Sequence, residues 1–489
     1  MNRLILSNPL VRRYYRSLLR PSSFWIYITI YVSVVILLLF VNTISTGSLS
    51  VPYYAFARGL FVQFLVIEVV LLWVWTTYNS ATVLKGEILN RTYDFFRLLP
   101  LSALQKTCGL LIGRNLLALL LAGVSLVPII GFGLLGRVSV ATEGQIVLLL
   151  LSVALFANSL VLLLSNTTSR AQTKTSSTVW LLLVVFSAPF ALAALFSLVG
   201  AVSEMPEARR YSIAFYAIRA PTLLLIGLIA LYFAVWNILG LVRKFTVEGE
   251  PLFGRMSALL YLLGYEIIAL GLFLPHLPDH QDKAYPMWLL VSLIPAVLIP
   301  LGSIRTFDSY LERCNPFRCQ DRTLRWAMLR CSNLTLATGL LVLWVAFSVI
   351  AVMVNGMSLM EFAYHAAGIL SFCLVLLLLL ELYVVYQPRF NQIGTLLCFL
   401  ALMYSIVPLI LAVATPVASL RFFSFLGFFV YLFDPSQSPG VAVKASILGV
   451  NALLCVIPAL LIGHRYAGIR LLRQTMAGTQ HPQSIQRAG

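Results

Sequence analysis

Long apolar stretches alternate with short polar segments along almost the whole chain. A transmembrane helix needs about 20 predominantly apolar residues to cross the hydrocarbon core of a bilayer. Twelve stretches approach or exceed that length, and the first is too long for the core of a signal peptide. They cover residues 24–41, 59–83, 109–135, 146–165, 178–201, 213–241, 257–274, 286–302, 333–354, 364–386, 392–414 and 441–463. The pattern therefore predicts an all-α, polytopic transmembrane bundle of about twelve spans.

The distribution of basic residues between these stretches predicts the orientation of the chain. If the N-terminus is inside, the inner segments carry roughly three times as many Lys and Arg residues as the outer ones. The outer segment 204–210 is the exception, and there two acids offset two arginines. Both termini are therefore expected to be cytoplasmic, as an even number of spans requires.

Composition supports a membrane protein and argues against a nucleic-acid-binding one. The chain is 60% hydrophobic and 10% charged, whereas ordinary globular domains have about 45–50% and about 25%. The net charge of +17 could suggest a nucleic-acid partner. The basic residues, however, lie between spans on the predicted inner side, so membrane lipid is the expected partner and nucleic acid is not.

A short basic helix is predicted before the first span. Asn8 caps it, Pro9 occupies its first position and Pro21 ends it. One face is apolar and the other carries arginines, which is typical of a helix lying in the headgroup plane. The apolar face comprises Leu10, Val11, Tyr14 and Leu18, and the basic face Arg12, Arg13, Arg16 and Arg20. A merely basic flank that orients the first span is the alternative.

The stretch between the second and third predicted spans, 84–115, has the most distinctive pattern. An amphipathic helix of about three turns is predicted to end before Pro100. Ser102 then caps the next helix, with Gln105 three residues on as a capping box. The polar face of the amphipathic helix is formed by Glu87, Asn90, Arg91, Asp94 and Arg97, and the opposite face by Ile88, Leu89, Thr92, Tyr93, Phe96 and Leu99.

This stretch resembles the first cytoplasmic loop of ABC type-2 transporter permeases. The resemblance covers about 30 residues of 489. Two positions depart from the family pattern: Asp94 stands where a Glu is usual, and Leu110 stands where a Lys is usual, with Lys106 nearby. The matching residues are Gly86, Glu87, Thr92, Asp94, Leu98, Leu99, Pro100, Leu101, Ser102 and Gly109.

The resemblance implies the membrane subunit of an ATP-driven exporter in a bacterial inner (plasma) membrane. The chain has no phosphate-binding loop of the type G-x-x-x-x-G-K-[ST], so ATP and Mg would belong to a separate ATPase subunit. We expect no catalytic site, cofactor or metal in this chain. Contact with the ATPase would be made by loops 84–108 and 303–332. The expected coupling residues are Glu87, Arg91, Thr92, Asp94, Arg97, Pro100 and Ser102.

The predicted organisation is two halves of six spans. Residues 1–245 would form a permease half with an N-terminal helix that resembles the elbow helix of these permeases. Residues 246–489 would form a second half with a large basic cytoplasmic loop. The simplest arrangement has parallel halves related about the membrane normal. A six-span permease unit with six divergent extra spans is the alternative, and a second permease chain is a further candidate partner.

Three acidic residues lie within predicted spans: Glu68, Glu266 and Glu381. A charge at the bilayer centre costs about 2.5–3.5 kcal/mol on insertion scales, so each should face protein or water. They could contact substrate, carry protons, or form hydrogen bonds between helices, with Asn158, Asn237 or Asn451 as partners. These residues would serve an ion-coupled secondary transporter, which is one functional alternative to the exporter. A polytopic membrane enzyme such as a lipid-linked glycosyltransferase is the other.

Overall fold

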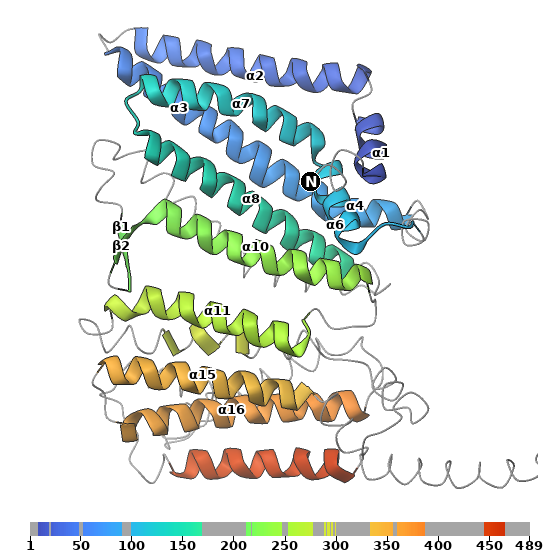
Figure 1. The fold of residues 1–489 in the computed structure, drawn as a ribbon, viewed down its shortest axis with the longest axis vertical. Coiled ribbons are helices and arrows are strands. Elements are labelled where there is room, and N and C mark those ends of the chain that lie inside the picture. Colours follow the sequence, from blue (N-terminus) through green and yellow to red (C-terminus); the bar gives the residue numbers. More distant parts are fainter. Residues whose placement is uncertain are drawn as a thin grey trace, which may run out of the picture. The chain divides into compact units, whose positions relative to one another are not determined.

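The structure is a computed structural model that is mostly helical (Figure 1). Among the residues it describes, eight helices are long and apolar enough to cross a membrane. A ninth apolar helical stretch, His365–Leu379, is shorter. The described residues are 8–18, 21–47, 52–89, 99–168, 212–216, 218–246, 253–276, 288–289, 291–293, 295–296, 299, 333–355, 359–386 and 445–464.

The predicted membrane class is thus supported, while the number of spans stays a prediction. Two of the twelve predicted spans, 178–201 and 392–414, lie outside the described residues, and span 286–302 is described only in part. The helices long and apolar enough to cross a membrane are Phe24–Val41, Tyr53–Leu84, Leu116–Leu135, Val140–Asn166, Thr222–Thr246, Arg255–Phe273, Leu336–Met353 and Ala445–His464.

The chain divides into two compact units. Unit 1 comprises Met1–Ala214 and Ile218–Leu252, and unit 2 comprises Phe215–Ala217 and Phe253–Gly489. The expectation of an internal repeat between residues 1–245 and 246–489 stays a prediction.

Unit 1 is built from long helices and one π-helical turn. Its elements are α1 Pro9–Leu18, α2 Pro21–Gly47, α3 Tyr53–Val69, the π-helix η1 Val70–Trp75, α4 Thr76–Leu89, α6 Ala103–Gly113, α7 Leu116–Leu135, α8 Val140–Thr168, β1 Ser212–Phe215, β2 Ile218–Pro221 and α10 Thr222–Thr246. The helices α3, η1, α7, α8 and α10 share one apolar core, and α1, α4, α6, α8 and α10 share another. The strands form a two-stranded sheet.

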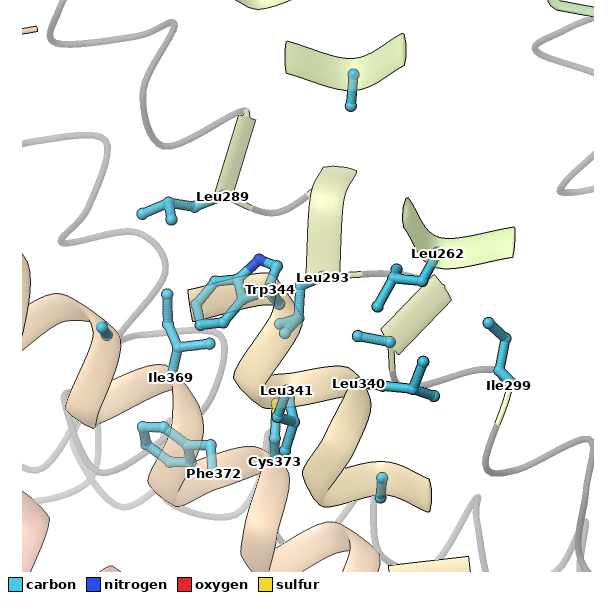
Figure 2. Close-up of a cluster of buried hydrophobic side chains, with 14 of the residues drawn as sticks. Leu262, Leu289, Leu293, Ile299, Leu340, Leu341, Trp344, Ile369, Phe372 and Cys373 are labelled. Carbon is cyan, nitrogen blue, oxygen red and sulfur yellow. The ribbon is translucent and has the colours of Figure 1, made fainter. Parts of the chain in front are cut away.

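Unit 2 contains α11 Arg255–Phe273, the 3₁₀-helix η3 Leu274–His276, α15 Asn333–Asn355, α16 Leu359–Tyr386 and the helix Ala445–His464. Apolar side chains from α11, α15, α16 and segment 288–299 converge in its core. Figure 2 shows Trp344 of α15 in this cluster, where its indole Nε1 donates to Ser292 Oγ at 2.8 Å.

The predicted end of the first helix before Pro21 agrees with the structure, since α1 ends at Leu18 and Pro21 is the first residue of α2. One predicted element boundary was wrong. The predicted span 213–241 begins instead with the β1–β2 hairpin, and its helix α10 starts at Thr222. Proline at the first helical position is favourable because its missing N–H would have no helical partner there.

The predicted span 109–135 is also not one helix. It is interrupted between α6 and α7 at Arg114 and Asn115. The side-chain amide of Asn115 donates to the carbonyl of Leu111 at 2.9 Å. That carbonyl is the acceptor a continuous helix would use for the backbone N–H of Asn115, so the side chain competes with the helical hydrogen bond.

Candidate functional site

The described part of the predicted cytoplasmic region forms a junction of three helices at one end of unit 1. Figure 1 shows α1 beside α6 and the end of α4. The predicted start of α1 is confirmed: the carboxamide oxygen of Asn8 accepts from the backbone N–H of Leu10 at 3.0 Å. The predicted apolar stripe faces inward at Leu10, Val11 and Tyr14, which are all buried, and the side chain of Leu18 lies outside the described part of the chain.

Two glycines of α6 allow α1 to approach closely. A Cβ atom at Gly109 would lie 2.9 Å from Leu10 Cβ, and one at Gly113 would lie 2.6 Å from Tyr14 Cδ2. Real Cβ atoms are not found at such distances. The small-x-x-x-small spacing thus brings the two helices together at positions where any larger residue would push them apart.

Polar contacts fasten the start of α1 to the start of α6. The side-chain amide of Asn8 donates to the carbonyl of Gln105 at 2.7 Å. Gln105 also completes the predicted capping box: Ser102 Oγ accepts from its backbone N–H at 3.2 Å, and its side chain accepts from the N–H of Ser102 at 2.9 Å. The capping box is confirmed, and the residue that completes it also accepts the hydrogen bond from α1.

Glu87, near the end of α4, connects α4 to α1. Its carboxylate accepts a hydrogen bond from the Tyr14 hydroxyl at 2.9 Å and forms an ion pair with Arg13 at 3.3 Å. Glu87 is buried, so its carboxylate faces α1 rather than the surrounding solvent. The sequence pattern placed Glu87 on a polar helical face but did not identify α1 as the partner of its carboxylate.

The environment of Tyr14 stabilises the neutral phenol. Burial, and then the neighbouring Glu87 carboxylate, raise the pKa of the Tyr14 hydroxyl well above its ordinary value. The hydroxyl therefore keeps its hydrogen at neutral pH and donates it to the carboxylate of Glu87.

The other predicted coupling residues are only partly described. Pro100 is exposed and Ser102 caps α6. Arg91, Thr92, Asp94 and Arg97 lie outside the described residues, and so does the second predicted contact loop, 303–332. Along the chain, segment 90–98 therefore lies between α4 and α6, two of the three helices that form the junction.

The three acidic residues of the predicted spans are all buried: Glu68 on α3, Glu266 on α11 and Glu381 on α16. Glu68 accepts a hydrogen bond from Ser125 of α7. Among the asparagines considered as partners, Asn158 bonds to Thr76 and Ser80, Asn237 to Ser159, and Asn451 to Ser371. Hydrogen bonds between helices are thus present, and these ones pair an amide or a carboxyl group with a hydroxyl.

A polar network inside unit 1 was not predicted. Asn158 of α8 donates to Thr76 Oγ1 at 2.8 Å and accepts from Ser80 Oγ at 2.9 Å. Asn115, at the break between α6 and α7, donates to Ser80 Oγ at 2.9 Å. The sequence signal was available, since both asparagines lie in strongly apolar stretches where an amide needs a partner.

Metal ligands and thiols are the remaining candidates for chemistry among the described residues. They contain no group of three or more His, Cys, Asp or Glu residues that could hold a metal ion. The outer cluster at 276–282 lies almost wholly outside them. Within the described ranges Cys108, Cys373 and Cys455 are free thiols.

The chain was compared with protein-family models, curated proteins and solved structures, and none of the three comparisons found a match.

Proposed function

We propose that this chain is the membrane-spanning permease subunit of an ATP-driven exporter of the ABC type-2 class. It would form the translocation path in a bacterial inner membrane, and a separate ATPase subunit would bind ATP and Mg. The observation that supports this most directly is the clamping of α1 to both α4 and α6. These two helices flank segment 90–98, which lies in the middle of the stretch that resembles the family's coupling loop.

The junction gives such a loop a way to act on the membrane spans. α4 continues through η1 into α3, and α6 leads through Asn115 into α7. A force applied to segment 90–98 would reach α4 and α6 together because Tyr14, Glu87 and the two glycines hold α1 against them. The amphipathic α1 would move along the membrane surface as one piece with them.

An ion-coupled secondary transporter is the second candidate function. Glu68 and Glu266 favour it, because both are fully buried on helices apolar enough to cross a membrane. Intramembrane carboxyl groups are common on proton and ion pathways. The two functions predict different partners, so one experiment separates them.

That experiment is purification of the tagged full-length chain from its native membrane in mild detergent, followed by mass spectrometry of the proteins that accompany it. The exporter predicts a stoichiometric soluble subunit with a phosphate-binding loop and ATPase activity. The measured stoichiometry would also show whether the complex contains a second permease chain. A chain that arrives alone, and binds no ATPase in the presence of nucleotide, would overturn the exporter and favour the secondary transporter.

A matched pair of glycine variants tests the role of the junction. Gly113→Ala would force Tyr14 and α1 away from α6, whereas Gly123→Ala on α7 meets no atom within 4 Å. We expect Gly113→Ala to retain the ATPase but to lose most of the stimulation of ATP hydrolysis by the permease, while Gly123→Ala behaves as wild type. Equal stimulation by both variants would show that the contact between α1 and α6 is not needed for coupling.

Docking itself is best tested in segment 90–98. Glu87 is a poor choice because its carboxylate already bonds to Tyr14 and Arg13. Reversing the charges of Arg91 and Asp94 should instead weaken ATPase binding, without disturbing the Tyr14–Glu87 contact. Unchanged binding by a correctly inserted double variant would count against this loop as the docking site.

A further inference from the structure

Glu266 lies inside the apolar core of unit 2. It sits in the middle of α11, on the same inward stripe as Leu262, Ala269 and Leu270, and its side chain is 0% exposed. α11 is one of the helices long and apolar enough to cross a membrane. A carboxyl group is therefore held where neither bulk water nor lipid headgroups reach it.

The carboxyl group has no hydrogen-bonding partner within the described part of the chain: neither oxygen of Glu266 receives a hydrogen bond there. The nearby donors bond elsewhere. Tyr265 donates its hydroxyl to the carbonyl of Val291 at 2.8 Å, and Tyr216 donates its hydroxyl to the carbonyl of Ile267 at 2.6 Å. Ser292 donates to Leu289.

Two segments that share the core with α11 carry no charged side chain. α15, which packs on α11, carries no ionisable side chain along its whole length. Segment 288–299, which contributes to the same core, carries none either. The titratable side chains of this core, among the described residues, are the phenols of Tyr216, Tyr261 and Tyr265 and the thiol of Cys373 on α16. α16 also carries the buried His365 and Glu381.

A carboxylate cannot persist in such surroundings, because an unpaired charge in an apolar core loses its hydration without any compensating interaction. A neutral carboxylic acid can persist, because its proton removes the charge. Glu68 differs, since Ser125 donates a hydrogen bond to one of its oxygens. Of the two, only Glu266 has both carboxyl oxygens without a hydrogen-bond donor in the described part of the chain.

We propose that Glu266 is a proton-binding site: it carries a proton at neutral pH while the helices around it are closed, and it exchanges that proton with water when they part. The ligand is the proton itself, which binds one carboxylate oxygen to give the neutral acid and leaves to give the carboxylate. The assignment does not depend on an ATPase partner, so it stands or falls separately from the proposed exporter function.

Infrared difference spectroscopy of the full chain in detergent tests the proposal, with Glu266→Gln as the reference variant. Gln has nearly the shape of the protonated acid and no proton to lose, so the variant should unfold at the wild-type temperature. The wild-type-minus-variant spectrum should show the carbonyl stretch of a neutral carboxylic acid at neutral pH. In D2O that band should shift while the protein stays folded. A carboxylate band in its place, or an acid band that D2O never shifts in the folded protein, would overturn the proposal.

Carbodiimide labelling provides a second measurement that needs no variant. Dicyclohexylcarbodiimide is apolar and reacts with protonated carboxyl groups, so it should modify Glu266 in the membrane at neutral pH. A water-soluble carbodiimide should not reach the residue until the chain is denatured. Peptide mass spectrometry locates the label. Failure of the apolar reagent to modify Glu266, or equal modification by both reagents in the folded protein, would contradict a closed, protonated site.

Discussion

Two residues of α1 contact the same carboxylate, and they differ in how much each should stabilise the junction. The Arg13 side chain is 46% exposed, so its ion pair with Glu87 is largely solvated. Exposed ion pairs typically contribute about 0.2–1 kcal/mol. The Tyr14–Glu87 hydrogen bond is buried, and hydrogen bonds to charged groups contribute about 1.5–3 kcal/mol. Tyr14 should therefore be the residue that holds α1 in place.

Replacing Tyr14 by Phe should loosen α1 by about 1.5–3 kcal/mol, because the buried Glu87 carboxylate then loses its hydroxyl donor. The measurement is the rate of tryptic cleavage within α1 in detergent, which should rise markedly. Tyr15→Phe is the matched control, since Tyr15 is the next residue and is 55% exposed. Equal cleavage of the two variants would show that the hydroxyl of Tyr14 does not anchor the helix.

The same contact predicts a dependence on alkaline pH. The pKa of Tyr14 is raised in the folded chain, whereas an unfolded Tyr titrates near pH 10. The unfolded chain thus loses this proton first, so the stabilisation is complete below about pH 10 and declines as pH rises toward the folded value. Melting temperatures of wild type and Tyr14→Phe should therefore converge above about pH 10. A constant difference between them would contradict the assignment.

The π-helix η1 lies between α3 and α4 and lets one row of buried residues run along the same side of all three elements. Glu68, Leu72, Thr76 and Ser80 follow one another at intervals of four residues, and all are buried. In a regular α-helix such a row drifts around the axis, since one turn takes 3.6 residues. The π turn takes up additional residues, so Thr76 and Ser80 still face Asn158.

Replacing Asn158 by Leu should destabilise unit 1 by about 1–2 kcal/mol. Hydrogen bonds between membrane helices contribute about 0.6 kcal/mol on average and about 1.7 at most, and Asn158 bonds to both Thr76 and Ser80. Unfolding in a denaturing detergent measures the loss. Asn237→Leu is the control, because the amide of Asn237 reaches Ser159 only at 3.4 Å. A larger loss in the control than in Asn158→Leu would contradict the network.

Local sequence signals predicted the starts of elements better than their interruptions. Asn8 and Ser102 were identified as caps because their side chains bond within three residues along the chain. The break at Asn115 depends on Ser80, 35 residues away, and η1 lies in the run VLLWVW, which has no Pro or Gly to mark it. The hairpin at 212–221 was predicted as part of a membrane span because several of its residues are apolar.

At the scale of the whole molecule, hydropathy predicted the class and most of the long helices, but not the partners of the candidate site. Glu87 was placed on a polar helical face from its spacing alone. Its contacts, Tyr14 and Arg13, lie 73 and 74 residues away in the sequence. No periodicity within a single helix encodes such a pairing, so it emerged only from the structure.

The predicted topology of twelve spans has a direct test. Green fluorescent protein fused after Gly489 should fluoresce, because an even number of spans leaves the C-terminus in the cytoplasm. Alkaline phosphatase fused at the same position should be inactive. The reverse pair of results would require an odd number of spans. The miscounted segment would then be sought first among 178–201, 286–302 and 392–414.

The long-range contacts of α1 also constrain the order of events during synthesis. Asn8 bonds to Gln105, which is made 97 residues later. At about 5–20 residues per second, the ribosome takes about 5–20 s to cover that distance. The basic helix therefore emerges first but docks late, after the first two predicted spans have been made. For those seconds, its arginines are available to anionic lipids before Glu87 and α6 have been synthesised.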